Sequence, residues 1–453
     1  MDTKQLRQKI LDLAIRGKLV PQDPNDEPAS VLLERVKAEK ERLIAEGKIK
    51  RSKKSAASSD KPHYPFEIPN NWVWTRLNEI TTLIEDCPHS TAKDEGSGYP
   101  LIRTPNVGVG RLLLEGVHRV SKDVYDKRNI RAIPQEGDII YAREAPAGNA
   151  ATIQKGEIVC LGQRTVLIRP LKGFVYSLLL TYFINAPLSR KSLISKAVGS
   201  TAAHVNMEVI RPFWIPLPPL QEQIRIVKEV ERLFTIINSI EIEQIELENK
   251  ISMMKSRVLE LAISGKLVPQ DPADEPADEL LLRINPSAKA ADKSHYQHLP
   301  QGWCVCKLED IVDYEQPQRY IVESTEYSEA YKTPVLTAGK SFVIGHTNET
   351  EGVFDKVPVI IFDDFTTDSK YVDFSFKVKS SAMKILHVKR GINIKYVYFF
   401  MSITRLVGKT HKRYWISEYS KLDIPLPPYN EQCRIVDAIE HINNRIDDIT
   451  DAL

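Results

Sequence analysis

The chain has 453 residues, of which 42% are hydrophobic and 27% are charged. That length predicts about three domains, and the apolar content is sufficient for ordinary globular cores. The formal net charge of +2 is uninformative as a total. Five cysteines form no C-x-x-C pair, and Cys304 and Cys306 lie in a strand-like run, so a metal or redox site is not expected. Without a signal-peptide core or an apolar run of about 18 residues, the sequence predicts a cytoplasmic protein with no membrane segment.

Residues 1–65 are predicted to form an N-terminal helical region followed by a basic linker. The segment from Pro28 to Glu46 has the pattern of a charged amphipathic helix, and a Ser/Ala-rich stretch follows up to Lys61. Residues 36–54 carry eight Lys or Arg against three Asp or Glu. A solvated flexible linker is the favoured interpretation, and phosphate contact or docking to another subunit are the alternatives.

Two bodies with a mixed α/β pattern are predicted, head 1 at 66–219 and head 2 at 297–428. Each opens with a Trp-bearing strand pattern, IPNNWVWTRLNEI in head 1 and LPQGWCVCKLEDI in head 2, and each closes at IPLPP. Short apolar runs such as DIIYA and PVIIFDDF alternate with Gly, Pro and Asn turns, which predicts many short strands. The sequences of the two heads differ almost throughout, so we expect unrelated inserts in a repeated frame.

The region between the heads, 220–296, is predicted to contain one long coiled-coil helix from Gln221 to Gly265. Its length would be roughly 65 Å at 1.5 Å per residue. Gly265 followed by Pro269 supplies the stop signal. Residues at a strict three-four spacing form the seam of this helix: Ile226, Val230, Leu233, Ile237, Ile240, Gln244, Leu247, Ile251, Met254, Val258 and Leu261.

An internal repeat frames both heads, because the two parts of the central region each occur a second time at opposite ends of the chain. The matched segments are IPLPPLQEQIRIVKEVERL at 215–233 with IPLPPYNEQCRIVDAIEHI at 424–442, and VLELAISGKLVPQDPADEPA at 258–277 with ILDLAIRGKLVPQDPNDEPA at 10–29.

The repeat predicts a partner for the central helix. Shifting the sequence places the C-terminal helix, 429–453, on the first half of the seam and the N-terminus on the second half. We therefore expect a composite second helix, antiparallel to the first, with Leu453 and Met1 within roughly 10 Å. The predicted fold is α+β, with two mixed α/β domains separated by a long antiparallel two-helix coiled coil in a pseudo-twofold, circular arrangement.

Charge is segregated within the heads. Residues 374–422 contain eleven Lys or Arg and one acidic residue, Glu418, whereas 309–330 contains seven acidic residues and Arg319. Head 1 repeats the bias across 160–211, with seven Lys or Arg against one Glu. Basic residues interleaved with Tyr, His, Thr and Asn suit a nucleic-acid groove, where cations meet phosphates and forked side chains meet base edges. A merely solvated basic face is the alternative.

Candidate DNA contacts are polar residues in or beside Gly/Thr/Asn-rich loops, where an apolar core would not place them. In head 1 they are Arg103, Asn106, Arg143, Arg164, Lys196, Ser200, Thr201, His204 and Asn206. In head 2 they are Lys340, Lys370, Lys409, Thr410, His411, Lys412, Arg413 and Tyr414, the last six forming one basic-aromatic loop.

Catalytic patterns are weak. Asp368 and Lys370 could be half of a nuclease site with Asp363 or Asp364 as metal partner, but nothing comparable occurs in head 1. The Pro-Pro-Tyr before the C-terminal helix lacks the amide residue of the N-P-P-Y methyltransferase motif, because Leu426 stands there. No P-loop, H-E-x-x-H or dinucleotide fingerprint is present. We therefore predict a protein with no catalytic residues, no bound metal and no cofactor of its own.

The paired IPLPP segments, the twice-occurring GKLVPQDP and the two variable heads resemble the specificity (S) subunit of Type I restriction-modification systems. The resemblance covers essentially the whole chain. It implies two target-recognition domains, each reading half of a bipartite double-stranded DNA site. It also implies two modification (M) subunits that bind S-adenosylmethionine, and two restriction (R) subunits that use ATP and Mg²⁺. This chain would differ from one family arrangement by a circular shift of the same ring.

Two other functions stay open at this stage. The chain could be a coiled-coil scaffold that displays two protein-binding heads, or a nuclease acting through Asp368 and Lys370.

Overall fold

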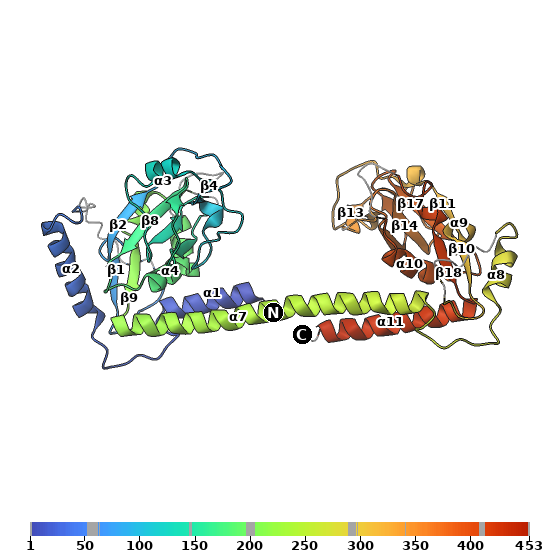
Figure 1. Ribbon diagram of the computed structural model, residues 1–453, viewed down its shortest axis with the longest axis horizontal. Helices are drawn as coiled ribbons and strands as arrows, with labels where there is room; N and C mark the ends of the chain where they lie inside the picture. Colours follow the sequence, from blue (N-terminus) through green and yellow to red (C-terminus); the bar gives the residue numbers. More distant parts are fainter. Residues whose placement is uncertain are drawn as a thin grey trace. The chain divides into compact units, whose positions relative to one another are not determined.

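The computed structural model describes residues 2–51, 62, 64–144, 147–195, 204–288, 296, 298–339, 341–406 and 413–451. It divides into two compact units, residues 1–243 and 244–453. Helix α7, Leu220–Ile263, begins in the first unit and ends in the second (Figure 1). These bounds confirm the long helix predicted from Gln221 to Gly265.

Head 1 is built on two sheets. The larger has the order β2-β8-β5-β6, all antiparallel neighbours. In the smaller, β3 lies between β4, which is antiparallel to it, and β7, which is parallel. The strands are β2 (Thr81–Asp86), β3 (Tyr99–Ile102), β4 (Arg119–Val120), β5 (Ile139–Ala142), β6 (Ala150–Thr152), β7 (Cys160–Leu161) and β8 (Thr165–Pro170).

Head 2 has the same strand order although its sequence is different. Its larger sheet runs β11-β17-β14-β15, and in its smaller sheet β12 lies between antiparallel β13 and parallel β16. The expectation of unrelated inserts is therefore wrong at the level of topology. The strands are β11 (Val312–Glu315), β12 (Thr333–Leu336), β13 (Val343–Thr347), β14 (Val359–Asp363), β15 (Ser369–Val372), β16 (Lys377–Val378) and β17 (Met383–Val388).

Strand periodicity explains why one sheet serves two cores. Side chains alternate between the faces of a strand, so Ile139 and Tyr141 of β5 enter one apolar cluster while Ile140 enters another. In head 2, Ile360 and Ile361 of β14 divide in the same way. Because both faces are buried, these strands are continuous apolar runs in the sequence, as DIIYA and PVIIF are.

Each head is closed by a two-stranded ribbon at its base. Strand β1 (Val73–Arg76) pairs antiparallel with β9 (Trp214–Leu217), which carries the first IPLPP segment. Strand β10 (Cys304–Lys307) pairs in the same register with β18 (Asp423–Leu426). The chain therefore enters and leaves each head at one place.

The terminal helices each pack on one half of α7 (Figure 1). Within the first unit, α1 (Thr3–Ile15) runs antiparallel to α7, and Arg7 donates to Asn238 at 2.7 Å and to Glu241 at 2.9 Å. Within the second unit, α11 (Tyr429–Asp451) places Asp447 at 2.6 Å from Lys255. The pairing of each terminal helix with α7 is as predicted, whereas the predicted meeting of Met1 and Leu453 lies outside the described residues.

The predicted seam is buried unevenly. Ile226, Val230 and Ile237 are buried against α1 and head 1. Met254, by contrast, has 55% of its surface exposed, although it stands at a seam position. It lies on the stretch of α7 that faces the end of α11, where Ile449 is also largely exposed, so the helix pair covers little apolar surface there.

Shorter helices connect these parts. Helix α2 (Ala29–Ala45) confirms the amphipathic helix predicted from Pro28 to Glu46. None of the helices in the described ranges is both long and apolar enough to cross a membrane. Others are α3 (Lys122–Arg128), α4 (Ser177–Asn185), α5 (Pro187–Ser195), α6 (Met207–Ile210), α8 (Ala277–Ile284), α9 (Leu308–Ile311) and α10 (Ile394–Ile403), with 3-10 turns η1 (Thr104–Asn106), η3 (Pro317–Tyr320) and η4 (Tyr419–Lys421).

Candidate nucleic-acid interface

Three of the predicted contacts in head 1 come together where β5 ends and β8 begins. The carboxylate of Glu144 lies 3.2 Å from Nε of Arg164 and 3.3 Å from Nδ1 of His204. Arg143, next to Glu144, donates its backbone N–H to the carbonyl of Arg164 at 3.0 Å. Residues from three separate stretches of the sequence thus form one polar cluster.

Within this cluster, Arg164 is the exposed cation. Its side chain keeps 53% of its surface exposed while Glu144 holds one edge of the guanidinium. Its φ of 65° lies in the left-handed region, which for a residue with a Cβ costs about 1–3 kcal/mol and is enriched at functional sites. The arrangement can present a positioned guanidinium to a phosphate or to the edge of a guanine.

Arg143 has a different environment from the one expected of a DNA contact. Its side chain is only 8% exposed and pairs with Oδ2 of Asp86 at 3.0 Å. The structure therefore places it inside the head, behind the cluster. The sequence signal was a polar residue after a strand, which does not distinguish an exposed cation from a buried ion pair.

The other described candidates of head 1 are Arg103, Asn106 and Asn206, and within the described residues their side chains form no hydrogen bond or ion pair with the side chains of this cluster. Oδ1 of Asn106 accepts from the backbone N–H of Arg103 at 3.2 Å within the turn η1, and Asn106 is buried. Its amide is used in shaping that turn. Asn206 is exposed and precedes α6 as its N-cap residue.

In head 2, the described candidates are Lys370, Arg413 and Tyr414. Lys370 is half-buried in β15, opposite Ile361 of β14, and Arg413 is exposed. Tyr414 is only 3% exposed and belongs to the apolar core of the head. Its ring therefore packs inside the head, and of these three only Arg413 presents a largely exposed side chain.

The acidic turn between β14 and β15 is occupied by internal contacts. Oδ1 of Asp363 accepts from the backbone N–H of Phe365 at 2.9 Å. Asp364 pairs with Lys384 at 3.3 Å, and Asp368 pairs with Arg405 at 2.8 Å. No group of three His, Cys, Asp or Glu among the described residues could hold a metal ion. The contacts give no support to the nuclease hypothesis, because each carboxylate is engaged in holding the turn or its neighbours.

Eight of the predicted contacts lie outside the described residues: Lys196, Ser200, Thr201, Lys340, Lys409, Thr410, His411 and Lys412.

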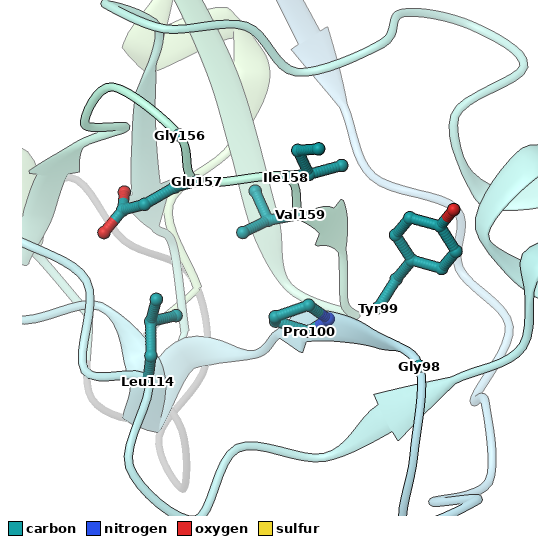
Figure 2. A pocket seen from close by; sticks show the side chains of 8 residues that line it. All are labelled: Gly98, Tyr99, Pro100, Leu114, Gly156, Glu157, Ile158 and Val159. Atoms are coloured by element: carbon teal, nitrogen blue, oxygen red, sulfur yellow. The ribbon is translucent and has the colours of Figure 1, made fainter.

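A pocket of about 550 Å³ opens on head 1 but has the wrong chemistry for DNA. Figure 2 shows the side chains that line it, from Tyr99 and Pro100 to Ile158 and Val159. Glu157 is the one charged residue among the eight described residues of its lining. An acidic, mainly apolar lining would repel phosphate, so the pocket is not part of the candidate interface.

The sequence reasoning missed a junction that fixes head 1 to α7. Nε1 of Trp72 donates to Oε2 of Glu222 at 2.9 Å, and Nε2 of Gln22 donates to Oε1 of the same carboxylate at 2.6 Å. Burial raises the pKa of Glu222 above its ordinary value, although both hydrogen bonds act to lower it. Gln223 also accepts from the backbone N–H of Tyr176, just before α4, at 2.9 Å.

The same junction is repeated in head 2. Nε1 of Trp303 donates to Oε2 of Glu431 at 3.0 Å, and Nε2 of Gln270 donates to Oε1 at 3.0 Å. Burial likewise raises the pKa of Glu431. The signal was present in the sequence, since both copies carry the Gln of VPQDP, the Glu-Gln after IPLPP and a Trp, but the repeat alone does not say that these residues touch.

Each junction also needs a glycine. Gly17 and Gly265 follow α1 and α7 with φ of 65° and 68°, the left-handed conformation that commonly ends a helix. A Cβ on Gly17 would lie 2.5 Å from Cγ of Pro69, and one on Gly265 would lie 2.3 Å from Cγ of Pro300. The repeated GKLVPQDP segment is thus explained by backbone geometry and close packing.

The family model described as "Type I restriction modification DNA specificity domain" matches residues 69–253 and 300–453. The chain belongs to this family. It is similar to the Type I restriction enzyme EcoAI specificity subunit of Escherichia coli, with 32% identity over 69% of this chain and 62% of that protein. The EcoR124I/EcoR124II specificity subunit of the same species is 49% identical over 31% of this chain and 34% of its own length. The match thus spans less than two thirds of each of these relatives.

The fold of this family member is also found in a solved structure. A chain from the study "Structural basis underlying complex assembly and conformational transition of the type I R-M system" aligns with a TM-score of 0.57, covering 86% of this chain and 94% of that one. Identity is 18%, so this likeness establishes the fold alone.

Proposed function

We propose that this chain is the DNA-recognition subunit of a Type I restriction-modification complex, in which each head reads one half of a bipartite double-stranded site. The observation that carries the proposal is the repeated topology of the heads. In both, a candidate lies close to the residue that follows the same strand, β5 or β14: exposed Arg164, directly before β8, in head 1 and exposed Arg413 in head 2. Two equivalent frames with different exposed side chains suit two different half-sites.

The chemistry of these positions fits base reading in a groove. A guanidinium can bond O6 and N7 of guanine together, which is the commonest specific contact in the major groove. Cations elsewhere on the basic segments would meet phosphates, which fix the register without reading sequence. Glu144, which holds Arg164, would limit the directions in which that guanidinium can point.

The chain would supply recognition and no catalysis. In this proposal, two modification subunits bind S-adenosylmethionine and two restriction subunits use ATP and Mg²⁺, in the cytoplasm. The relatives that match are specificity subunits. Exposed Met253 and Met254 on α7, at 71% and 55%, support docking of a partner subunit on the helices, because contiguous exposed apolar side chains commonly mark protein interfaces.

Filter binding to random duplex DNA across a salt series tests the DNA-binding function. Phosphate neutralisation requires log Kd to depend steeply on log salt, and removing two cations from the DNA interface should flatten the slope by up to about two units. We expect this flattening for Lys412→Ala with Arg413→Ala. The control is Arg257→Ala, an exposed cation on α7 paired with Glu260, which should leave the slope unchanged.

Two outcomes would contradict the proposal. Salt-independent or absent binding would favour a protein scaffold with two protein-binding heads. Nicking of duplex DNA by the purified chain with Mg²⁺ would favour the nuclease instead. Methylome sequencing of a strain that carries the chain with its modification subunit would then give the bases read by each head.

A further inference from the structure

In head 1, the residue that follows the inner strand β5 connects this strand to the basic segment. Arg143 follows β5, donates its backbone N–H to the carbonyl of Arg164 at 3.0 Å, and accepts at its own carbonyl from the N–H of Val205 at 3.0 Å. Its nearly buried guanidinium pairs with Asp86, at the end of β2, at 3.0 Å. Three strands and the incoming segment therefore meet at this residue.

The equivalent residue of head 2 is Asp364, which follows β14. It donates its backbone N–H to the carbonyl of Ala382 at 2.9 Å and accepts from the N–H of Tyr414 at 2.9 Å. Its carboxylate accepts from the N–H of Trp415 at 2.8 Å and pairs with Nζ of Lys384 at 3.3 Å. The side chains of Asp364 and Lys384 are only 3% and 1% exposed.

The two heads thus share the backbone bonds of this joint but close it with ion pairs to different strands, β2 in head 1 and β17 in head 2. The cation follows the inner strand β5 in head 1, whereas the anion follows the inner strand β14 in head 2. The residue held by each joint, Val205 or Tyr414, occupies the same place in the internal repeat, 209 positions apart. The attraction within a buried ion pair roughly offsets the cost of desolvating its two charges. We therefore expect these pairs to act mainly by fixing local geometry and to contribute little net stability.

Resting on the DNA-recognition function proposed above, we propose that the Asp86–Arg143 pair and the Asp364–Lys384 pair are positioning pairs that set base specificity, one for each half-site. The joint fixes the backbone immediately after His204 in head 1 and Arg413 in head 2. Hydrogen bonds to base edges need placement within about 0.5 Å, whereas contacts to phosphates tolerate more movement. Breaking one of these ion pairs should therefore reduce the preference for particular bases more than it reduces the overall affinity for DNA.

The test uses the full chain and selection of bound sequences from random duplex DNA, with Asp364→Asn, Lys384→Met, and both together. Asparagine keeps an oxygen for the N–H of Trp415 but leaves Lys384 without a counter-charge. Each single change should lower base preference in one half-site by roughly tenfold or more, with the salt slope and the other half-site unchanged. The double change removes both charges and should restore much of the lost preference.

Matched changes in head 1 locate the effect. Asp86→Asn should relax the opposite half-site from Asp364→Asn. Asp138→Asn breaks another ion pair of head 1, 2.6 Å to Arg169, but at the other end of β5. It should lower the melting temperature without changing the selected bases.

Three results would overturn the inference: both half-sites staying sharp in the Asp364 and Lys384 variants, both half-sites relaxing together, or Asp138→Asn relaxing bases as strongly as Asp86→Asn. A wild-type chain that selects no bases at all would instead overturn the proposed function, so the two failures are distinguishable.

Discussion

The indole N–H of Trp72 donates to the buried carboxylate of Glu222 at 2.9 Å, and the copy of this bond between Trp303 and Glu431 is 3.0 Å long. In each case a tryptophan at the entrance of a head binds a helix that belongs to the repeated frame. The bond joins the repeated frame, whose two copies are similar in sequence, to a head, and the two heads differ in sequence almost throughout. It therefore gives both heads the same attachment to the repeated frame.

Removing that bond should destabilise the unit that contains it. Trp72→Phe leaves one oxygen of a buried carboxylate without its donor, and such a loss costs about 1–3 kcal/mol. The expected result is a lower melting temperature by calorimetry. Trp214→Phe is the matched control, because Nε1 of Trp214 has no hydrogen-bond partner among the described residues. An equal loss in both variants would show that ring volume, and not the hydrogen bond, matters at Trp72.

The raised pKa of Glu222 predicts an unusual pH dependence. Burial raises the folded-state pKa above the ordinary 4.5, so protonation favours the folded state. The stabilising contribution is complete below the unfolded pKa and is lost as the pH rises through the folded pKa. The melting temperature of Glu222→Gln minus that of the wild type should therefore increase as the pH is raised from about 4.

Glu229 provides the control of opposite sign. A hydrogen bond from Arg232 lowers its pKa, so its contribution is present above the unfolded pKa and is lost as the pH falls through the folded value. The melting temperature of Glu229→Gln minus that of the wild type should therefore decrease with rising pH. The decrease should be slight, because the pair with Arg232 is exposed to solvent. A difference for Glu222→Gln that stays flat or falls would contradict the proposed burial effect.

The packing of α1 on α7 makes a prediction about the N-terminal helix. Leu11 is 3% exposed within the core of the first unit, whereas Leu6, five residues earlier, is 38% exposed. Truncating a buried leucine costs about 2–5 kcal/mol, so Leu11→Ala should lower the thermal stability of the first unit strongly. Leu6→Ala should have a much smaller effect. Similar losses in both variants would mean that α1 does not use the face assigned to it.

Elements with long periodic patterns or literal repeats could be predicted from the sequence, and side-chain pairings could not. The seam residues Ile226 and Val230 predict the helix α7, because helical periodicity can be recognised within a short stretch of sequence. The common topology of the heads was missed, since strand order depends on pairing between segments that are far apart in the sequence, and a short apolar run such as that around Ile139 or Ile360 does not specify its neighbours. Arg143 was misjudged for a related reason. Its partner Asp86 is 57 positions away in the sequence, and no local pattern links them.

The last prediction concerns the spacer between half-sites, and it follows from α7 being one helix that begins in the first unit and ends in the second. Seven residues inserted after Gln244 keep the three-four seam in phase and lengthen the helix by about 10 Å. The insertion lies between the α1 contact at Glu241 and the α11 contact at Lys255, so both helix pairs keep their partners. DNA rises about 3.4 Å per base pair, and the modified site should therefore gain about three base pairs of spacer while its specific bases stay the same.

The matched control for this variant is seven residues inserted after Ser55, in the linker that precedes head 1, which should leave the spacer unchanged. Methylome sequencing reads both outcomes, and it separates a change of spacing from a loss of affinity caused by added rotation of the heads. A site that keeps its original spacer after the Gln244 insertion would mean that α7 does not set the distance. A change in the specific bases would mean that base recognition does not depend on the heads alone, because no residue within either head has been altered.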